Sequence, residues 1–538
     1  MISISGDSAS KGIAMGSLRI FKSGAKVERT LVSDVEAESE RFLEAVHEAK
    51  RQLNSLKRKA NSETIENGAQ ILEAHEMLMD DENFKGEIID YIKEECVNAE
   101  YALVRVTNDL SEEFASLDDD YISGRSADIR QVSSRLLTIL SGKDMDFSAN
   151  HGPEIVIADE LTPGEIVYMG KKKLAGCIIR QGAYNSHASI ILRSMGIPAV
   201  IGVEVNPDLL KDGMTAVVNG NDGSVILDPT EEIASSARKE IIEQAEKTKK
   251  LAELKGVRTR TGSGREVLVS ANIGSVLGAD NALLNDAEGI GLFRSEFLFL
   301  GRNRMPSEDE QFEAYKTVAQ KMEGKRVVIR TLDMGADKQV PYIMMRPEVN
   351  PALGMRGIRL CFKEKEIFKT QLRAILRASV YGNIAIMYPM IVSDKEVLTA
   401  KALLNEAVDE LKERNVEYKV PKQGVMIETP AAVMIMNELC DVADFFSIGT
   451  NDLVQYSLAL DRQSPGRNGY GDMHHPAIIR MIDMCVKTAR EHGKHIGICG
   501  ELGADTTLTR HFVETGIDEL SVAPSMVLKI REEILNLE

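Results

Sequence analysis

The second half of the chain repeats one pattern, a short β-like run followed by a helical segment, and this rhythm limits the fold more than any other feature. From about Arg265 to the end there are eight such units in roughly 270 residues, which is the size and repeat number of a (β/α)8 barrel. The predicted strands are Val267–Ala271, Gly289–Leu292, Val327–Thr331, Ile384–Pro389, Gly424–Glu428, Phe445–Ile448, His495–Cys499 and Leu520–Val522.

Chemistry in such a barrel is done by side chains at the C-terminal ends of the strands. Each residue at these positions has an ordinary explanation alone, because an arginine can pair with a surface acid and a buried cysteine is usually a small apolar residue. Two arginines, two carboxylates, an amide and a thiol on one rim exceed what stability requires, so they predict a binding site. The strand ends supply Arg294, Arg330, Met390, Glu428, Asn451 with Asp452, Cys499 and Ser521.

Arginines in this region are candidates for binding an anionic substrate. A guanidinium group binds phosphate and carboxylate through two parallel hydrogen bonds, and Arg294, Arg330, Arg356 and Arg462 are all available. The sequence has no Gly-x-x-x-x-Gly-Lys-Ser/Thr loop, so the phosphate need not belong to a nucleotide.

The other rim residues fit a metal and an acid–base group. Glu428 and Asp452 are hard oxygen donors that can hold one Mg²⁺, and Asn451 adds a neutral donor beside them. Cys499 is a plausible acid or base on the opposite face of a small substrate. A Mg²⁺-bound phosphorylated carboxylic acid would satisfy the whole set.

A second candidate site lies in the first half of the chain, at His187. The apolar run Leu174–Ile179 leads into a glycine turn, and the turn presents the imidazole where an apolar-periodic helix begins. Asn185 or Ser186 can cap that helix, whose start offers free N–H groups and partial positive charge to an anion. His187 could therefore carry a phosphoryl group, although a histidine that merely lies in a helix cap fits this segment equally well.

Composition shifts divide the chain. Residues 1–30 and 144–230 hold short β-like runs with Gly and Pro between them and predict one α/β domain that contains His187. Residues 31–143 are helical by pattern and predict a bundle inserted into that domain. Residues 231–255 predict a charged helical linker, and residues 256–538 the barrel.

The inserted bundle is acidic. Between Leu31 and Lys143 there are 25 Asp and Glu residues against 13 Lys and Arg, so this segment carries −12 of the chain's −18. A solvated helix face is the ordinary explanation, and a landing surface for a small basic protein is the alternative. His75, on one of these helices, is interpreted as structural.

Composition also excludes several classes of protein. The net charge of −18 argues against binding nucleic acid or an anionic membrane surface. Six scattered cysteines without a Cys-x-x-Cys pair are typical of reduced cytosolic thiols. No apolar run approaches the roughly 20 residues that cross a bilayer, so we expect a cytoplasmic protein without membrane insertion.

Several motifs in one order make the chain similar to a known family. It resembles Enzyme I of the bacterial sugar phosphotransferase system, the phosphoenolpyruvate-protein phosphotransferases, over nearly its whole length. The matching motifs are Ser-His187-Ala-Ser-Ile with Gly196-Ile-Pro198, Gly289-Ile-Gly-Leu-Phe-Arg294-Ser-Glu-Phe-Leu, Arg330-Thr-Leu-Asp333-Met-Gly-Ala-Asp337-Lys338, Asn350-Pro-Ala-Leu-Gly-Met-Arg356-Gly-Ile-Arg359, Glu428-Thr-Pro-Ala-Ala, Gly449-Thr-Asn451-Asp452-Leu and Cys499-Gly-Glu501.

The resemblance implies a role for each matching residue. His187 corresponds to the phosphorylated histidine and Cys499 to the acid that protonates the enolpyruvate methylene. Glu428 and Asp452 correspond to the Mg²⁺ ligands. The phosphoenolpyruvate clamp and phosphate contacts correspond to Arg294, Arg330, Arg356, Arg462, Asn451 and Asp452.

The resemblance also implies partners and motion. Phosphoenolpyruvate would phosphorylate His187 and leave as pyruvate, and the histidine domain would swing on the 231–255 linker to a carrier protein. The 31–143 bundle would be the docking domain for that carrier, HPr, and the barrel would form a homodimer. The relay would be the first step of sugar uptake.

Some residues depart from the family pattern. The turn before His187 usually reads Gly-Gly-x-Thr-Ser-His, whereas here the segment is Gln181-Gly182-Ala-Tyr-Asn185-Ser186-His187. Asn185 can replace the threonine as a cap, but we expect a changed rate or phosphohistidine stability. Lys11 stands where proline is usual. The chain stops at Glu538, short of the family's last helical segment, which would weaken barrel closure or change subunit pairing.

Two alternatives remain at this stage. A pyruvate phosphate dikinase or phosphoenolpyruvate synthase relative shares the histidine and barrel motifs but needs a large ATP-binding domain, for which the 31–143 bundle is too small and too helical. A non-catalytic docking protein with an Enzyme I fold is the other alternative, and the intact set of arginines, carboxylates and Cys499 argues against it.

Overall fold

The computed structural model describes residues 1–21, 27–62, 65, 68–116, 120–142, 153–183, 186–300, 302, 304–335, 340, 342–343, 348, 350, 352–460 and 472–538. The chain divides into two compact units, residues 1–247 and 248–538. Helix α8 (Glu231–Ala252) runs through the boundary between them. Among the described helices, none combines the length and apolar content needed to cross a membrane.

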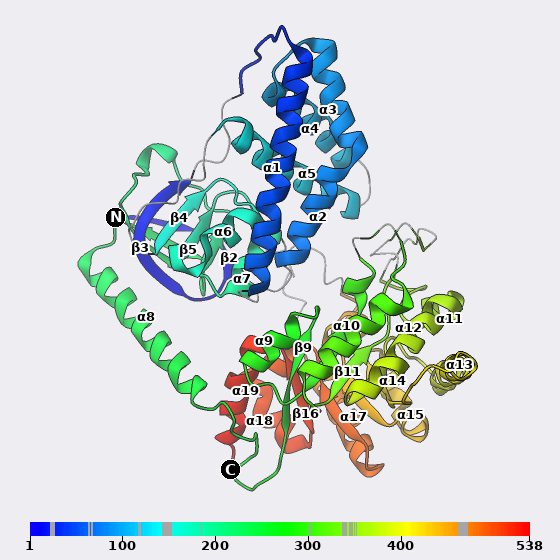
Figure 1. Ribbon diagram of the computed structural model, residues 1–538. Coiled ribbons are helices and arrows are strands. Elements are labelled where there is room, and N and C mark those ends of the chain that lie inside the picture. Colours follow the sequence, from blue (N-terminus) through cyan, green and yellow to red (C-terminus); the bar gives the residue numbers. More distant parts are fainter. Residues whose placement is uncertain are drawn as a thin grey trace. The chain divides into compact units, whose positions relative to one another are not determined.

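The first unit contains an eight-stranded mixed sheet in the order β1-β8-β7-β3-β4-β5-β6-β2 (Figure 1). Strands β3 to β6 are parallel neighbours, whereas β7 and β8 pair antiparallel. The strands are β1 (Ile2–Ser5), β2 (Asp7–Ser10), β3 (Ile13–Phe21), β4 (Glu154–Ala158), β5 (Leu174–Ile179), β6 (Ala199–Ile201), β7 (Thr215–Asn219) and β8 (Ser224–Leu227).

A five-helix bundle is inserted between two strands that are neighbours in this sheet. Strand β3 ends at Phe21 and its parallel partner β4 begins at Glu154, so the bundle leaves and returns at one place. Figure 1 shows its helices side by side above the sheet domain. They are α1 (Val35–Ser62), α2 (Gly68–Asp80), α3 (Glu82–Glu95), α4 (Ala99–Ser116) and α5 (Asp120–Leu140).

One apolar core joins the bundle to the sheet domain. Leu53 of α1 and Leu72 of α2 belong to the same buried cluster as Ile166 of α6 (Pro163–Lys173) and Ile191 of α7 (His187–Met195). Burial of such side chains contributes about 1.5–3 kcal/mol each. This packing fixes the bundle against α6 and α7, and α7 is the helix that begins at His187.

The second unit is a closed barrel of eight parallel strands in the order β9 to β16, with β16 paired to β9. The barrel is therefore closed. The strands are β9 (Leu268–Ile273), β10 (Ile290–Arg294), β11 (Val327–Arg330), β12 (Ile384–Tyr388), β13 (Lys422–Ile427), β14 (Phe445–Ile448), β15 (His495–Ile498) and β16 (Glu519–Val522).

Helices connect the barrel strands and cover the barrel. They are α9 (Gly278–Leu284), α10 (Glu308–Lys321), α11 (Ile358–Lys363), α12 (Lys365–Ala378), α13 (Asp394–Glu413), α14 (Pro430–Met434), α15 (Met436–Val442), α16 (Thr450–Ser457), α17 (Pro476–Glu491), α18 (Thr506–Thr515) and α19 (Val527–Leu535). Short 3₁₀ helices span Pro207–Leu209, Glu296–Leu298, Ser379–Tyr381, Glu501–Ala504 and Pro524–Met526.

An ion-pair cluster around the buried carboxylate of Glu519 lies at the N-terminal end of the barrel. Glu519, the first residue of β16, pairs with Arg326 and lies 3.1 Å from Nε2 of His495. Burial alone raises the pKa of Glu519, but Arg326 and His495 lower it more, to about 2. Charged groups at this end of a barrel serve stability rather than chemistry.

The fold class predicted from the sequence is confirmed. All eight predicted barrel strands are present, with bounds that differ by at most two residues at either end. The sequence reasoning missed β1, β2 and β6, because each has only three or four residues and their pairing partners lie far along the chain.

Candidate active site

The C-terminal ends of the barrel strands bring most of the predicted site residues to one rim. Arg294 and Arg330 are the last residues of β10 and β11, and Glu428 and Cys499 directly follow β13 and β15. Asn451 and Asp452 lie in the first turn of α16, after β14. Arg356 precedes α11 in the β11–β12 connection, and Arg462 lies outside the described residues.

Two of the arginines, Arg330 and Arg356, are buried and share the carboxylate of Asp333. Nη2 of Arg330 lies 2.9 Å from Glu296, and its Nη1 lies 3.1 Å from Asp333. Asp333 also accepts from Nη2 of Arg356 at 3.0 Å, and Nη1 of Arg356 lies 3.5 Å from Asp452. This chain of buried charges fixes the two guanidinium groups before any substrate arrives, which is the preorganisation that charge stabilisation requires.

Glu428 is the most perturbed carboxyl group of the rim. It is fully buried, its Oε1 accepts a 2.6 Å hydrogen bond from the Met390 N–H, and its Oε2 is buried without a hydrogen-bond partner. Burial and the nearby charges of Asp452 and Asp333 raise its pKa well above the usual range. A carboxylate in this setting is the kind of group a divalent cation stabilises.

Met390 has an unusual backbone conformation beside Glu428. Met390 has φ +57°, a left-handed conformation that non-glycine residues adopt at a cost. Its N–H is the donor to Glu428, so the strain aims a backbone hydrogen bond into the rim.

Cys499 lies at the end of β15, next to the packed barrel interior. Burial raises the pKa of its thiol to about 11, so the group carries its proton at neutral pH. It is therefore suited to act as an acid rather than as a thiolate nucleophile.

Asn451 is oriented by a neighbour that follows the next strand. Its Nδ2 donates to Glu501 at 3.1 Å, and its Oδ1 accepts from the Glu501 N–H at 2.9 Å. Arg294, by contrast, is exposed at the rim.

The second candidate site lies in the first unit, where α7 begins at His187. Ser186 is the N-cap, and its hydroxyl accepts from the Ser189 N–H at 3.3 Å. The His187 side chain is 38% exposed, and its Nδ1 lies 3.2 Å from Oδ1 of Asp128. Asn185, the other cap candidate, lies outside the described residues.

Asp128 comes from helix α5 of the inserted bundle, so the bundle completes the surroundings of His187. The same Oδ1 lies 3.5 Å from Nε2 of His75 on α2. Burial alone raises the pKa of Asp128, but the two imidazoles lower it more, and the net pKa is well below the usual range. Asp128 is therefore an anion held between two histidines.

Three family models cover most of the chain. The one described as "PEP-utilising enzyme, PEP-binding domain" matches residues 248–538, the "mobile domain" model matches 151–223, and the "N-terminal" model matches 5–125.

Curated relatives match over the whole length. A phosphoenolpyruvate-protein phosphotransferase of Priestia megaterium is 40% identical over 99% of this chain and 94% of its own. That of Bacillus subtilis is 38% identical over 100% of this chain and 95% of its own. The chain belongs to the phosphoenolpyruvate-protein phosphotransferase family.

Membership in the phosphoenolpyruvate-protein phosphotransferase family makes the chain a transferase and bears on the first of the two alternatives. The match to these phosphotransferases extends over both units, which favours this family over a dikinase or synthase relative. A solved structure titled "NMR solution structure of Enzyme I (nEIt) protein using two 4D-spectra" is 31% identical and covers 45% of this chain and 99% of its own, with a TM-score of 0.38, too low to bear on the fold.

Sequence reasoning missed several residues around the two candidate sites, the barrel rim and the surroundings of His187. Glu296 and Asp333 stand within motifs that the resemblance rests on, and their spacing from Arg294 and Arg330 was the available signal. Asp128 gave no signal, since it is one of many acids in the bundle. His75, interpreted as structural, is 3% exposed and faces Asp128.

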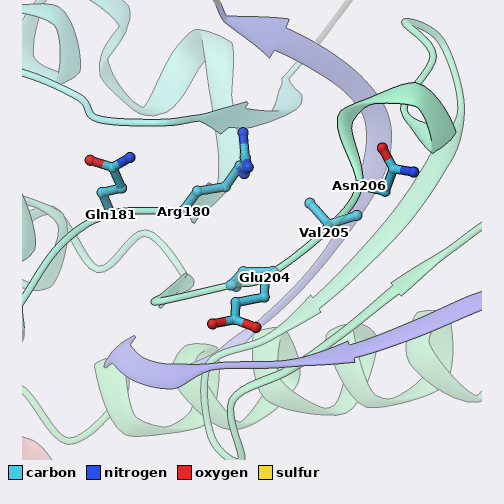
Figure 2. Close-up of a pocket in the computed structure, with 6 residues that line it drawn as sticks. Arg180, Gln181, Glu204, Val205 and Asn206 are labelled. Carbon is cyan, nitrogen blue, oxygen red and sulfur yellow. The ribbon is translucent and has the colours of Figure 1, made fainter.

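A pocket of 460 Å³ lies on the sheet domain, beside the segment that leads to His187 (Figure 2). None of the predicted phosphotransferase site residues lines it. Arg180 at its edge is paired with Asp159 at 2.6 Å. The lining residues are Arg180, Gln181, Val203, Glu204, Val205 and Asn206.

Proposed function

We propose that this chain transfers the phosphoryl group of phosphoenolpyruvate to its own His187 and then to a histidine of the small carrier protein HPr. Pyruvate is the other product, and the relay is the first step of sugar uptake by the phosphotransferase system. The observation that carries the proposal is the setting of His187, a half-exposed imidazole at a helix start with one nitrogen facing a buried carboxylate.

The orientation of the imidazole selects the attacking atom. Because Nδ1 faces Asp128, Nδ1 carries the ring proton and Nε2 keeps its lone pair for attack. Asp128 also stabilises the positive charge that develops on the ring as the N–P bond forms. The free N–H groups at the start of α7 suit the transferred phosphoryl group.

The barrel rim holds the other reactant. The guanidinium groups of Arg294, Arg330, Arg356 and Arg462 bind the phosphate and carboxylate oxygens of phosphoenolpyruvate, with Asn451 at the phosphate. Phosphoryl transfer needs mainly positioning and charge neutralisation, and the buried pairs of Arg330 and Arg356 supply both without reorganisation.

Mg²⁺ is the proposed cofactor, held by Glu428 and Asp452. The buried, unpartnered Oε2 of Glu428 and its raised pKa are the observations that fit a cation. When bound, Mg²⁺ supplies positive charge against the phosphate oxygens and draws Glu428 into its ionised form.

Protonation of the product completes the reaction. Nε2 of His187 forms a bond to phosphorus, the bond from phosphorus to the enol oxygen breaks, and enolpyruvate leaves with that electron pair. The Cys499 thiol, protonated at neutral pH, gives its proton to the methylene carbon to form pyruvate, and water restores the thiol proton.

The carrier protein is proposed to dock on the bundle of residues 31–143. Its 25 acidic residues against 13 basic ones attract a basic partner, and Asp128 and His75 connect the bundle to His187. Helix α8 joins the two units. It is the proposed pivot on which the histidine domain swings between the barrel and the carrier protein.

The proposed setting is a cytoplasmic homodimer formed through the barrel. All six cysteines are unpaired, which fits a reducing compartment. Large apolar side chains on the outer helices of the barrel, including Leu398, Met434 and Met484, are 49%, 72% and 47% exposed and are compatible with a subunit contact.

The experiment is incubation of the full chain with Mg²⁺ and phosphoenolpyruvate labelled in the phosphate. Wild type should take up acid-labile label on Nε2 of His187 with matching pyruvate release, and His187→Ala should take up none. Addition of HPr should move the label to the carrier. Equal label in both proteins, or none in either, would overturn the proposal and favour a docking protein.

A further inference from the structure

Three metal-ligating side chains converge beside the α7 helix start and are only partly used by the proposed chemistry. Nε2 of His75, Oδ1 of Asp128 and Nδ1 of His187 all lie within 4.8 Å of one another. Asp128 is the centre of the group, 3.5 Å from the first histidine and 3.2 Å from the second.

The separations of 3.2 and 3.5 Å from Oδ1 of Asp128 are compatible with three ligands of one metal ion. Ligand atoms bound to Zn²⁺ at about 2.0–2.2 Å in a tetrahedron lie about 3.3 Å apart. Nε2 of His75 and Oδ1 of Asp128 are buried and neither has a hydrogen-bond partner. Buried polar atoms of a native protein normally have a partner, and a cation between these two atoms would supply one to both.

The chemistry of the three ligands selects the kind of metal. Two imidazoles and one carboxylate suit zinc and other first-row transition ions, whereas Mg²⁺ and Ca²⁺ prefer oxygen donors.

The site is also accessible and incomplete. Side-chain exposure is 4% for His75, 20% for Asp128 and 38% for His187, so one ligand is anchored and the others reach solvent. Three protein ligands leave room for a fourth from water, which is typical of exchangeable rather than purely structural zinc sites.

We propose that His75, Asp128 and His187 form a binding site for a divalent transition metal of the zinc type, and that metal at this site prevents His187 from accepting a phosphoryl group. The binding part stands by itself, and the inhibition part rests on the proposed function. A metal on Nδ1 would displace the proton that Nδ1 otherwise carries, and in the neutral ring that proton then resides on Nε2. The Nε2 lone pair is therefore no longer available to attack phosphorus.

The binding experiment uses the full chain, stripped with a chelator, and titrates Zn²⁺ by calorimetry and Co²⁺ by visible absorption. Wild type should bind one ion at this site, and His75→Gln, Asp128→Asn and His187→Gln should each weaken it by at least about 100-fold. His47→Gln, at an exposed position on α1, is the matched control and should bind as wild type does. His187→Gln tests the site without disturbing the buried bundle positions.

The inhibition experiment measures labelling from phosphoenolpyruvate at saturating Mg²⁺ with increasing Zn²⁺. Zinc should inhibit wild type and His47→Gln at concentrations that do not lower the labelling rate of His75→Gln below its own zinc-free rate. Equal inhibition of all three proteins would assign the effect to the barrel and overturn the regulatory part.

The two ways of failing are distinguishable. Zinc affinity that is unchanged in all three ligand variants would overturn the metal site even if labelling occurs. A metal-free wild type that takes no label would overturn the proposed function, while the zinc titration would still report on the site.

Discussion

The His187 site and the barrel rim differ in how their charged side chains are exposed and held. His187 is half-exposed, stands at a helix start and contacts one carboxylate from another part of its unit. Arg330 and Glu428 are buried, and each is surrounded by several opposite or like charges. The group proposed to serve two partners is held by few contacts, whereas the groups proposed to bind phosphoenolpyruvate are fixed in a network.

This difference has an energetic consequence. Removing one member of a buried charge network leaves its partners uncompensated and costs both stability and function. Removing a contact of an exposed histidine costs mainly function. Variants of the two sites should therefore separate in whether stability and activity fall together.

Arg356→Met should have the largest effect, because it leaves Asp333 and Asp452 buried without this cation. We expect the free energy of unfolding of the barrel to fall by about 3–5 kcal/mol and labelling of His187 to fall by about 10³-fold. Denaturant unfolding and the labelling rate measure the two. Arg510→Met, whose pair with Glu514 is 62% and 65% exposed, is the control, and equal stability of both variants would break the contrast.

Cys499→Ala tests the thiol that is proposed to protonate the product. Pyruvate formation should slow by about 10²–10⁴-fold, the usual contribution of a positioned acid, with little change in thermal stability. The rate of pyruvate appearance is the measurement. Cys485→Ala, equally buried but on the outer helix α17, should keep the wild-type rate, and a fast Cys499→Ala enzyme would remove the thiol from the mechanism.

Asp128→Asn tests the carboxylate that faces His187. The amide cannot hold the Nδ1 proton of His187 as an anion does, so labelling in metal-free protein should slow by about 10- to 100-fold. The melting temperature should change little compared with Arg356→Met. Asp109→Asn on α4, an exposed acid of the same bundle, should label as wild type does, and a wild-type rate for Asp128→Asn would show that orientation is set elsewhere.

Glu519→Gln separates stability from function at the opposite end of the barrel. The folded pKa of Glu519, about 2, lies below the usual value of about 4.3 in an unfolded chain. Its stabilisation is therefore complete above about pH 4.3 and lost as the pH falls toward 2. We expect wild type to lose stability over that window and the variant to lose less, with about 2 kcal/mol already missing at pH 7. Unfolding curves across pH measure this, and Glu514→Gln, at an exposed position, should follow wild type.

Ser186→Ala should have the smallest effect. It removes the side-chain cap of α7, which stabilises a helix by about 1 kcal/mol, so the first unit should unfold at slightly lower denaturant. Ser194→Ala, exposed on the same helix, is the control. A loss much larger than the control's would mean that Ser186 does more at the acceptor site than cap a helix.

Local patterns predicted much of this architecture. The alternation of β-like runs and helices indicated the barrel, and the strand-end rule then placed Arg294, Arg330, Glu428 and Cys499 on one rim. The glycine turn and the apolar period indicated a helix start at His187. These signals work because they depend on residues within about one element of each other.

Contacts between distant segments were beyond such reasoning. Nothing near Asp128 in the sequence distinguishes it from the other acids of the bundle, and its role depends on how α5 packs beside α7. Asp333 was visible in a motif, but its position between two arginines follows from the path of the β11–α11 connection.

The sequence by itself determined the element types, the barrel and the side chains available for chemistry, because periodicity and strand ends are properties of short segments. Tertiary structure decided which nitrogen of His187 faces a carboxylate, which oxygen of Glu428 is buried without a hydrogen-bond partner, and which acids hold the buried arginines. Those outcomes depend on the packing of segments far apart in the chain, where shape and burial set the pairing of charges.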